Sequence, residues 1–422
     1  MYHLMTLVTA EVSGLLTMVA GYALQAVGIA IFAVLLRYRR IQPRTIYITA
    51  LILYAVCLIP AVLGTTLTGT IIFGFLMSLL CGVIAGCYLF ELTEYMTNDR
   101  RAVSFGIGYG VATIASWLLS LIDNGLLYYG NSVLIVCLVL TALAVLSAFI
   151  PSQSMNEPTD EVPEQEPQFH LWKLLLLSGV VVLLFSLVNN IGFSFSTPEL
   201  QGGLRPEFSR LFYTVGLITA GFVTDKSRKY GAVCALASLV IPFIVLALRS
   251  EPISSTVFWA LGYFAFGFYS VYRIILFSDI AKARKLIFLS GFGLMIGRVG
   301  DAAGYGIYTA FSARGAVLVV LAALLFAGSI FLFIWLFQIL YVPTVTRQRS
   351  EREIFEDFSI THALSGRERE VLKLLLLDKS NKEISEALYV SESTVKFHIH
   401  NLLQKTGCKS RIDLKSTYNV SQ

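Results

Sequence analysis

The residues best suited to chemistry lie near the C-terminus, on a helix that the sequence predicts from Ser391 to about Thr406. This helix bears Lys396, His398 and His400, which we expect to point outward. Cationic and hydrogen-bonding side chains on one exposed helix can contact nucleic-acid phosphates and base edges. The pattern therefore predicts a DNA-contacting surface, against the alternative that these charges only form a solvated face.

Two more helices must position this surface, and each begins with a capping box. Ser365 with Glu368 opens the first helix, and Ser380 with Glu383 opens a shorter second one. Tyr389 and the valine after it make a tight turn before the DNA-contacting helix. Two helices joined by such a turn form a helix-turn-helix, whose second helix reads the major groove of DNA.

Eight side chains follow as candidate DNA contacts. Lys396 is expected to contact a phosphate or a guanine, whereas Phe397 would touch a thymine methyl group or only shield the surface. His400 would make a weaker or pH-dependent contact, because its charge is not assured at neutral pH. The full set is Ser393, Thr394, Lys396, Phe397, His400, Lys405, Lys409 and Arg411, of which the last three suit backbone phosphates.

These residues resemble the LuxR-type helix-turn-helix family, the four-helix DNA-binding domains of bacterial transcription regulators. The resemblance covers about 60 of the 422 residues and implies promoter DNA as a partner. It also implies a fourth helix, at about 411–420, that contacts a second copy and so gives a homodimer on DNA. The matching residues are Leu364-Ser365, Arg367-Glu368, Glu370-Val371-Leu372, Asn381-Lys382-Glu383-Ile384, Ser391-Glu392-Ser393-Thr394-Val395-Lys396, His398, Lys405 and Arg411.

The chain departs from the family pattern at three places. Asp378-Lys379 stands where the family usually has a glycine, which predicts a differently built turn. Phe397 replaces a common small aliphatic residue, and His400 replaces a common lysine, on the side that faces DNA. The preferred DNA sequence is therefore expected to differ from that of relatives.

The overall composition is that of a membrane protein. Hydrophobic residues make up 56% of the chain and charged residues 14%, with a mean hydropathy of +0.72, outside the norm for soluble domains. Apolar runs that approach the ~20 residues needed to span a bilayer cover residues 12–36, 45–63, 69–90, 103–122, 132–150, 172–195, 208–223, 231–248, 254–277, 286–311 and 315–341. We expect an all-α chain, a polytopic transmembrane bundle of about eleven helices followed by the four-helix DNA-binding domain.

Basic residues gather in alternate loops between these runs. They follow the first, third, seventh and ninth runs: Arg37, Arg39, Arg40, Arg44, Arg100, Arg101, Lys226, Arg228, Lys229, Lys282, Arg284 and Lys285. The excess of basic residues in cytoplasmic loops places this set inside the cell. The sequence thus predicts a multi-pass protein of a bacterial cell membrane, in contact with lipids, with its DNA-binding domain in the cytoplasm.

The linkers predict how the bundle is divided. An acidic, proline-rich segment separates five runs from six. The motif GFVTDKSRKYGA at 221–232 resembles the cytoplasmic loop motif of the major facilitator superfamily, with RYRRIQPR at 37–44 as a weaker counterpart. That resemblance implies six helices in each half, so we expect that the first helix is missing or was lost at a mis-assigned start codon. The expected units are 1–150 and 172–341 for the two halves, 151–171 and 342–360 for the linkers, and 361–422 for the DNA-binding domain.

A few polar residues lie within the apolar runs. Arg298 and Asp301, three apart on one helix face, form a self-neutralising pair or a ligand-binding charge. Asn189 and Asn190 line a cavity or bond neighbouring helices. Arg273 is expected to extend to the cytoplasmic end of its helix. A further cluster could line a pocket for an apolar or aromatic ligand; it comprises Tyr263, Phe264, Phe266, Phe268 and Tyr269.

The sequence predicts no enzyme, because it has no nucleophile constellation, metal-ligand spacing or phosphate-binding loop. We also expect no cofactor. The main hypothesis is a membrane-bound, one-component transcription regulator whose bundle senses a small molecule, apolar or aromatic. The first alternative is a transporter with a fused regulatory DNA-binding domain. The second is a membrane protein whose helix-turn-helix binds another protein.

Overall fold

The computed structural model describes residues 12, 14–38, 41–63, 66–121, 132–147, 171–196, 208–247, 252–342 and 351–420. Within these ranges the chain is helical and contains no strand. The contacts divide it into two compact units, residues 1–343 and 344–422. The acidic segment expected as a linker lies outside the described residues, except for Leu171 at the start of a helix.

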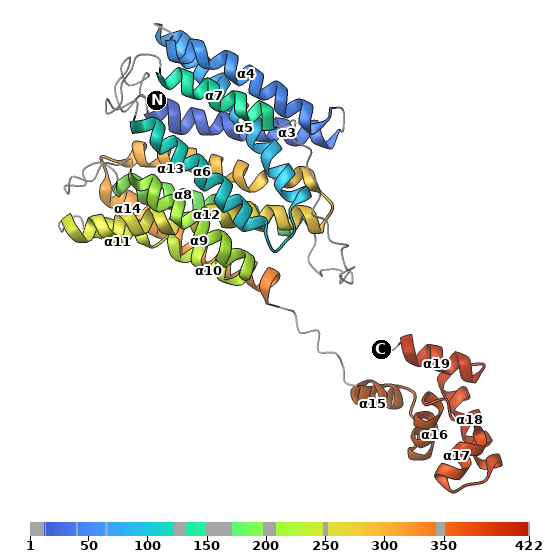
Figure 1. The fold of residues 1–422 in the computed structure, drawn as a ribbon. Helices are drawn as coiled ribbons and strands as arrows, with labels where there is room; N and C mark the ends of the chain where they lie inside the picture. The colour runs from blue at the N-terminus through green and yellow to red at the C-terminus, as the bar shows by residue number, and fades with distance from the viewer. Residues whose placement is uncertain are drawn as a thin grey trace. The chain divides into compact units, whose positions relative to one another are not determined.

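Long helices that follow the apolar runs build the N-terminal unit (Figure 1). Their order and bounds are η1 (Leu15–Gly21, a π-helix), α3 (Tyr22–Arg37), α4 (Pro43–Leu63), α5 (Leu67–Tyr95), α6 (Arg101–Leu121), α7 (Ser132–Ser147), α8 (Leu171–Ser196), α9 (Ser209–Lys226), α10 (Arg228–Ser238), α11 (Ile241–Ala247), α12 (Pro252–Ala283), η4 (Ile287–Leu289, a 3₁₀-helix), α13 (Phe292–Phe311) and α14 (Gly315–Tyr341).

Six stretches of helix among the described residues are long and apolar enough to cross a membrane. They are Leu15–Arg37, Pro43–Ala61, Leu67–Tyr95, Leu171–Ser194, Thr256–Ala283 and Gly315–Tyr341. Many of their large apolar side chains stay exposed, among them Phe331 at 72% and Leu324 at 66%. Lipid-facing helices carry such apolar surfaces, so these stretches are compatible with insertion in a membrane.

Small residues let α13 lie directly against α8. A side-chain carbon added at Gly304 would come within 2.9 Å of Asn190 Cβ, and one at Gly300 would overlap Ser186. Glycine at these two positions therefore permits the close crossing of the two helices. The crossing brings the polar residues of α8 next to the charged stretch of α13.

A charge network joins α6, α9, α10 and α12 at one end of the N-terminal unit. Arg101 contacts Asp279 at 2.6 Å, and Arg228 contacts both Asp279 and Asp225 at 2.8 Å. Asp225 also accepts the first free N–H groups of α6, from residues 102 and 103, at 2.9 and 2.7 Å. Basic residues from the loops after α5 and α9 thus meet on one side of the helices, as their sequence pattern requires.

Five helices build the C-terminal unit: α15 (Glu351–Thr361), α16 (Gly366–Leu376), α17 (Asn381–Leu388), α18 (Glu392–Thr406) and α19 (Arg411–Val420). Both predicted capping boxes are present, at Ser365 with Glu368 and at Ser380 with Glu383. Ser391 caps α18, and Gly407 ends it in the left-handed conformation. The core residues come from all five helices: Phe358, Leu364, Val371, Leu372, Leu375, Ile384, Val395, Leu402, Leu414 and Tyr418.

Two features of this unit differ from the expectation. The segment 342–360 was expected to be a linker, yet much of it forms α15, whose Phe358 is 4% exposed in the core. The turn at Asp378 was expected to be built differently from a glycine turn. That prediction is wrong: Asp378 has φ 61°, and Lys379 N–H bonds Leu374 C=O at 3.2 Å, as in a glycine-ended helix. A short polar side chain tolerates this conformation.

Candidate functional site

The exposed face of α18 carries the candidate DNA contacts. Val395 and Leu402 are fully buried, which fixes the rotation of the helix. That rotation leaves Lys396 and His400 exposed, together with Phe397 at 61%. His398 is only partly exposed, and its ring centroid lies 5.7 Å from that of Phe397. The helix thus presents one cation, one imidazole and one exposed aromatic ring on a surface that carries no core residue.

The N-terminal turn of α18 supplies hydroxyl groups. Ser391 Oγ accepts the Thr394 N–H at 3.2 Å, and it shares hydrogen bonds with Ser393 Oγ at 2.7 Å and Thr394 Oγ1 at 2.8 Å. These bonds satisfy a free backbone N–H group at the start of the helix. Ser393 and Thr394 therefore belong to the cap, at the positively polarised end of the helix, where phosphates bind favourably.

Two of the predicted phosphate contacts have partners within the unit. Lys405 Nζ donates to Glu368 Oε2 at 2.7 Å and to Ala363 C=O at 3.1 Å, so it fastens α18 to the start of α16. Arg411 donates to the Lys379 carbonyl and thereby ties α19 to the turn after α16. Lys396 and Lys409 have no side-chain partner among the described residues, and both are exposed. Their charges are the ones available to a ligand.

The two capping glutamates have pKa values below the ordinary range. Burial raises the pKa of Glu368, but the hydrogen bonds from Lys405 and from Ser365 outweigh it and lower the pKa overall. At Glu383 the hydrogen bonds from Ser380 and then Lys379 lower the pKa to about 2. Both carboxylates are therefore ionised at neutral pH and hold the helix starts that orient α18.

Comparison with known proteins gives the family. Residues 362–417 match the model described as bacterial regulatory proteins, luxR family. Over 56 residues the chain is 48% identical to the spore germination protein GerE of Bacillus subtilis (strain 168), across 13% of this chain and 76% of that protein. Through its C-terminal domain, the chain belongs to the luxR family. Proteins of this family are transcriptional regulators, not enzymes, and their domain implies binding to promoter DNA.

Other luxR-family relatives match over smaller shares of their length. The transcriptional regulatory protein DegU of Brevibacillus brevis is 52% identical over 50 residues, 12% of this chain and 21% of that protein. The nitrate/nitrite response regulator protein NarP of Escherichia coli (strain K12) is 43% identical over 72 residues, 16% of this chain and 32% of that protein. The chain thus spans a third or less of these two relatives, and the likeness lies in the DNA-binding domain.

Outside the luxR-family domain, the N-terminal unit contains a second group of predicted residues. Arg298 Nη1 lies 3.5 Å from Asp301 Oδ2, so the structure brings these two residues together as expected. Arg273 joins them, with its Nη1 at 3.3 Å from the same carboxylate oxygen. The expectation that Arg273 extends to the end of its helix is wrong, because its side chain is 3% exposed. It lies ten residues before the end of α12, about 15 Å away.

Asn189 and Asn190 lie on α8, beside this group. Asn189 is 1% exposed, and neither its Oδ1 nor its Nδ2 has a hydrogen-bond partner among the described residues. Asn190 Oδ1 is likewise buried and unpaired, although its Cβ lies against Gly304 of α13. The alternative in which these amides bond neighbouring helices therefore finds no support in the described residues.

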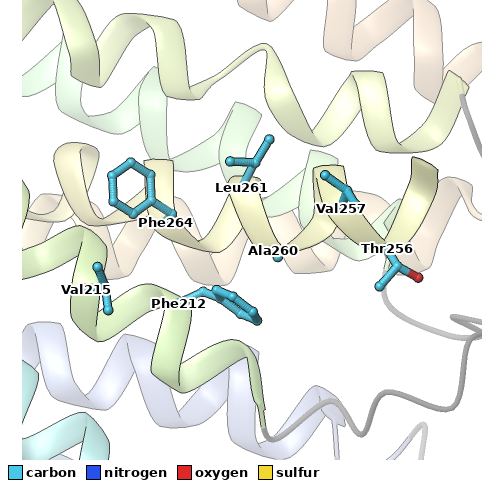
Figure 2. Close-up of a pocket in the computed structure, with 7 residues that line it drawn as sticks. All are labelled: Phe212, Val215, Thr256, Val257, Ala260, Leu261 and Phe264. Carbon is cyan, nitrogen blue, oxygen red and sulfur yellow. The ribbon is translucent and has the colours of Figure 1, made fainter. Parts of the chain in front are cut away.

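The aromatic cluster of α12 is divided between a groove and the core. Phe264 lines an apolar groove of about 590 Å³ between α9 and α12, together with Phe212, Val215, Thr256, Val257, Ala260 and Leu261 (Figure 2). Tyr269 instead packs in the core, with no exposed area. Side chains of this groove are themselves exposed, such as Val215 at 56% and Val257 at 52%. The groove therefore lies open on the surface of the unit.

Arg273 is the functional candidate that the sequence analysis missed. Its signal was weak in the sequence, because the apolar run predicted at 254–277 ends only four residues after Arg273, whereas α12 continues to Ala283. The pairing itself could not be read from the sequence, because the two residues lie on different helices.

Proposed function

We propose that this chain is a membrane-bound, one-component transcription regulator. The supporting observation is that one chain carries both a luxR-family domain and a unit with six stretches of helix long enough to span a bilayer. The proposal places this unit in the cell membrane and the domain in the cytoplasm. The bundle senses a small molecule, and the domain binds promoter DNA as a homodimer through α19.

The arrangement of the helices also supports a likeness to the major facilitator superfamily. The expected motif at 221–232 forms the turn between α9 and α10, and its Asp225 lies in the charge network with Arg228 and the start of α6. We propose a bundle of about eleven spans in two halves, 1–150 and 172–341, joined by the linker 151–171 that the sequence predicts. The helix α15 then belongs with the DNA-binding domain.

Any such switch requires that the small molecule bind two states of the bundle with different affinity. Because α15 packs into the C-terminal core, the connection between the units is shorter than the sequence suggested. It runs from Tyr341 at the end of α14 to Glu351. We propose that this short segment transmits the change, by altering how two domains pair on DNA.

DNA selection by the intact chain tests the proposal. The full-length protein in lipid vesicles would be incubated with sheared genomic DNA from its own source, and the retained fragments would be sequenced. Enrichment of a defined set of promoter fragments is expected. Lys396→Ala should reduce their retention, because removal of a base contact costs about 1–3 kcal/mol.

A matched lysine provides the control. Lys373 is exposed on α16 and belongs to none of the predicted DNA contacts, so Lys373→Ala should leave retention unchanged. Equal retention by the native chain and Lys396→Ala would contradict a DNA-reading role for α18 and favour a protein partner instead.

A further inference from the structure

Among the described residues, the buried charges around Asp301 do not balance. Arg273 and Arg298 both approach one oxygen of one carboxylate, Asp301 Oδ2, at 3.3 and 3.5 Å. These distances exceed the ~2.7–2.9 Å of a close charge-assisted hydrogen bond. Two guanidinium groups and one carboxylate leave one positive charge in excess, in a place where an isolated charge is costly.

Among the described residues, several polar atoms of these two arginines and of the neighbouring helix α8 are buried without a partner. They are Nε of Arg273, Nε of Arg298, both side-chain polar atoms of Asn189, and Oδ1 of Asn190. A buried polar group without a hydrogen bond costs about 1–3 kcal/mol. The unpaired Nε–H donors of the two guanidinium groups and the excess positive charge are the pattern expected of a site that lacks its anion.

Tyrosine rings and a hydroxyl group surround the two arginines. Arg298 lies over the ring of Tyr22 at 4.5 Å, and Arg273 lies over that of Tyr269 at 5.1 Å. The Tyr269 hydroxyl bonds Ser186 Oγ of α8, and Tyr109 and Tyr213 are within electrostatic range of both guanidinium groups. These residues come from α3, α6, α8, α9 and α12, so both halves of the bundle contribute to the site.

We propose that Arg273 and Arg298 bind the carboxylate of a small organic acid, whose body lies against these tyrosines. The planar guanidinium matches a carboxylate in shape, and one negative charge would balance the excess. The amides of Asn189 and Asn190 would supply further hydrogen bonds. This inference rests on the proposed sensing function and specifies its ligand class. It also adds Arg273 to the site and adds a carboxylate to the apolar or aromatic ligand that the sequence predicts.

An isosteric substitution tests the excess positive charge without any ligand. Asn190→Asp changes the charge at this position while keeping the shape of the side chain. If the site lacks an anion, the variant of the full-length chain in lipid nanodiscs should unfold about 2–4 °C higher than the native protein. In an Arg298→Gln background, where Arg273 and Asp301 already balance, the same change should lower the midpoint. A lower midpoint for Asn190→Asp in the native background would overturn the proposal.

Acids and their amides provide a second measurement, should Asn190→Asp not fold. Acetate, benzoate and 3-phenylpropionate would be compared with acetamide, benzamide and 3-phenylpropionamide in the native chain and in Arg273→Gln. At least one acid should raise the unfolding midpoint more than its amide, and only in the native chain. Equal shifts for every acid and its amide, or no shift with any acid, would overturn the proposal.

DNA retention separates this inference from the function on which it rests. An acid that stabilises the bundle but leaves promoter retention unchanged would support the site and contradict the sensing role. Altered retention with a compound that binds equally well to Arg273→Gln would support sensing and overturn this site.

Discussion

Two exposed lysines of the luxR-family domain differ in what their ammonium groups contact, and therefore in their roles. Lys396 has no partner among the described residues, whereas Lys405 bridges the buried carboxylate of Glu368 and the Ala363 carbonyl. The sequence placed both in one DNA-binding set, since a family pattern does not distinguish a lysine that holds the fold from one that faces the ligand. The structure gives Lys405 a positioning role for α18, and Lys396 stays the proposed DNA contact.

Loss of Lys405 is therefore expected to destabilise the domain. Lys405→Ala leaves the Glu368 carboxylate, 4% exposed, without its cation. The free energy of unfolding should fall by about 1–3 kcal/mol, and the partial exposure of the lysine places the loss towards the lower figure. Urea unfolding of a fragment covering residues 344–422 measures it, with Lys409→Ala, on an exposed turn, as the control. Equal losses for the two variants would contradict the assigned role.

The capping glutamate of α17 predicts a pH dependence. Hydrogen bonds from Ser380 and Lys379 lower the pKa of Glu383 to about 2, from an ordinary value of 4.5. Because the folded pKa is the lower one, Glu383 stabilises the fold above about pH 4.5, and this contribution is lost as the pH falls towards 2. Glu383→Gln keeps a capping side chain but does not titrate. Between pH 5 and 2, the unfolding midpoint of the Glu383→Gln fragment should vary less than that of the native fragment. The control Glu386→Gln, at an exposed residue of the same helix, should vary as much as the native fragment.

Local helix signals were sufficient to predict α16, α17, α18 and α19, because each begins at a side-chain cap that the sequence displays. The exceptions are features that depend on how the helices pack against one another. Tyr389 has φ 53° although it is 95% exposed and bears a bulky side chain, a conformation that costs about 1–2 kcal/mol. No local preference favours it; the packing of α17 against α18 imposes it. The helix α15 was missed because its sequence is mostly polar, and only Phe355 and Phe358, three apart, indicated a buried side.

The packing of α15 predicts that it is an integral part of the DNA-binding domain. The Phe358 ring lies 5.2 Å from Tyr418 of α19 and 4.5 Å from His362. Phe358→Ala should lower the free energy of unfolding by about 3–5 kcal/mol. Ile360→Ala on the same helix, at a side chain 66% exposed, should change it by less than about 0.5 kcal/mol. Denaturant unfolding of the 344–422 fragment measures both. A small effect of Phe358→Ala would show that α15 is part of the linker and not of the domain.

At the scale of the whole chain, hydropathy predicts where helices lie but not which charges meet. A membrane-spanning segment must satisfy its own backbone, so its length and apolarity are visible locally. The partner of a buried charge is not visible, because it lies on a distant segment. Arg101 pairs with Asp279, and Arg273 pairs with Asp301 rather than with a membrane surface. The network at Asp279 nevertheless agrees with the loop charges, since residues predicted to share one side of the membrane meet there.

This agreement predicts the orientation of the chain in the membrane. Lys229, in the first turn of α10, should face the cytoplasm, and Arg314, between α13 and α14, should face outside. Both residues are exposed, so Lys229→Cys and Arg314→Cys can be compared in a background that lacks the six native cysteines. A membrane-impermeant maleimide added to intact cells should label Arg314→Cys alone, and Lys229→Cys should react only after lysis. The reverse pattern would place the luxR-family domain outside the compartment that contains DNA and would rule out the proposed regulator.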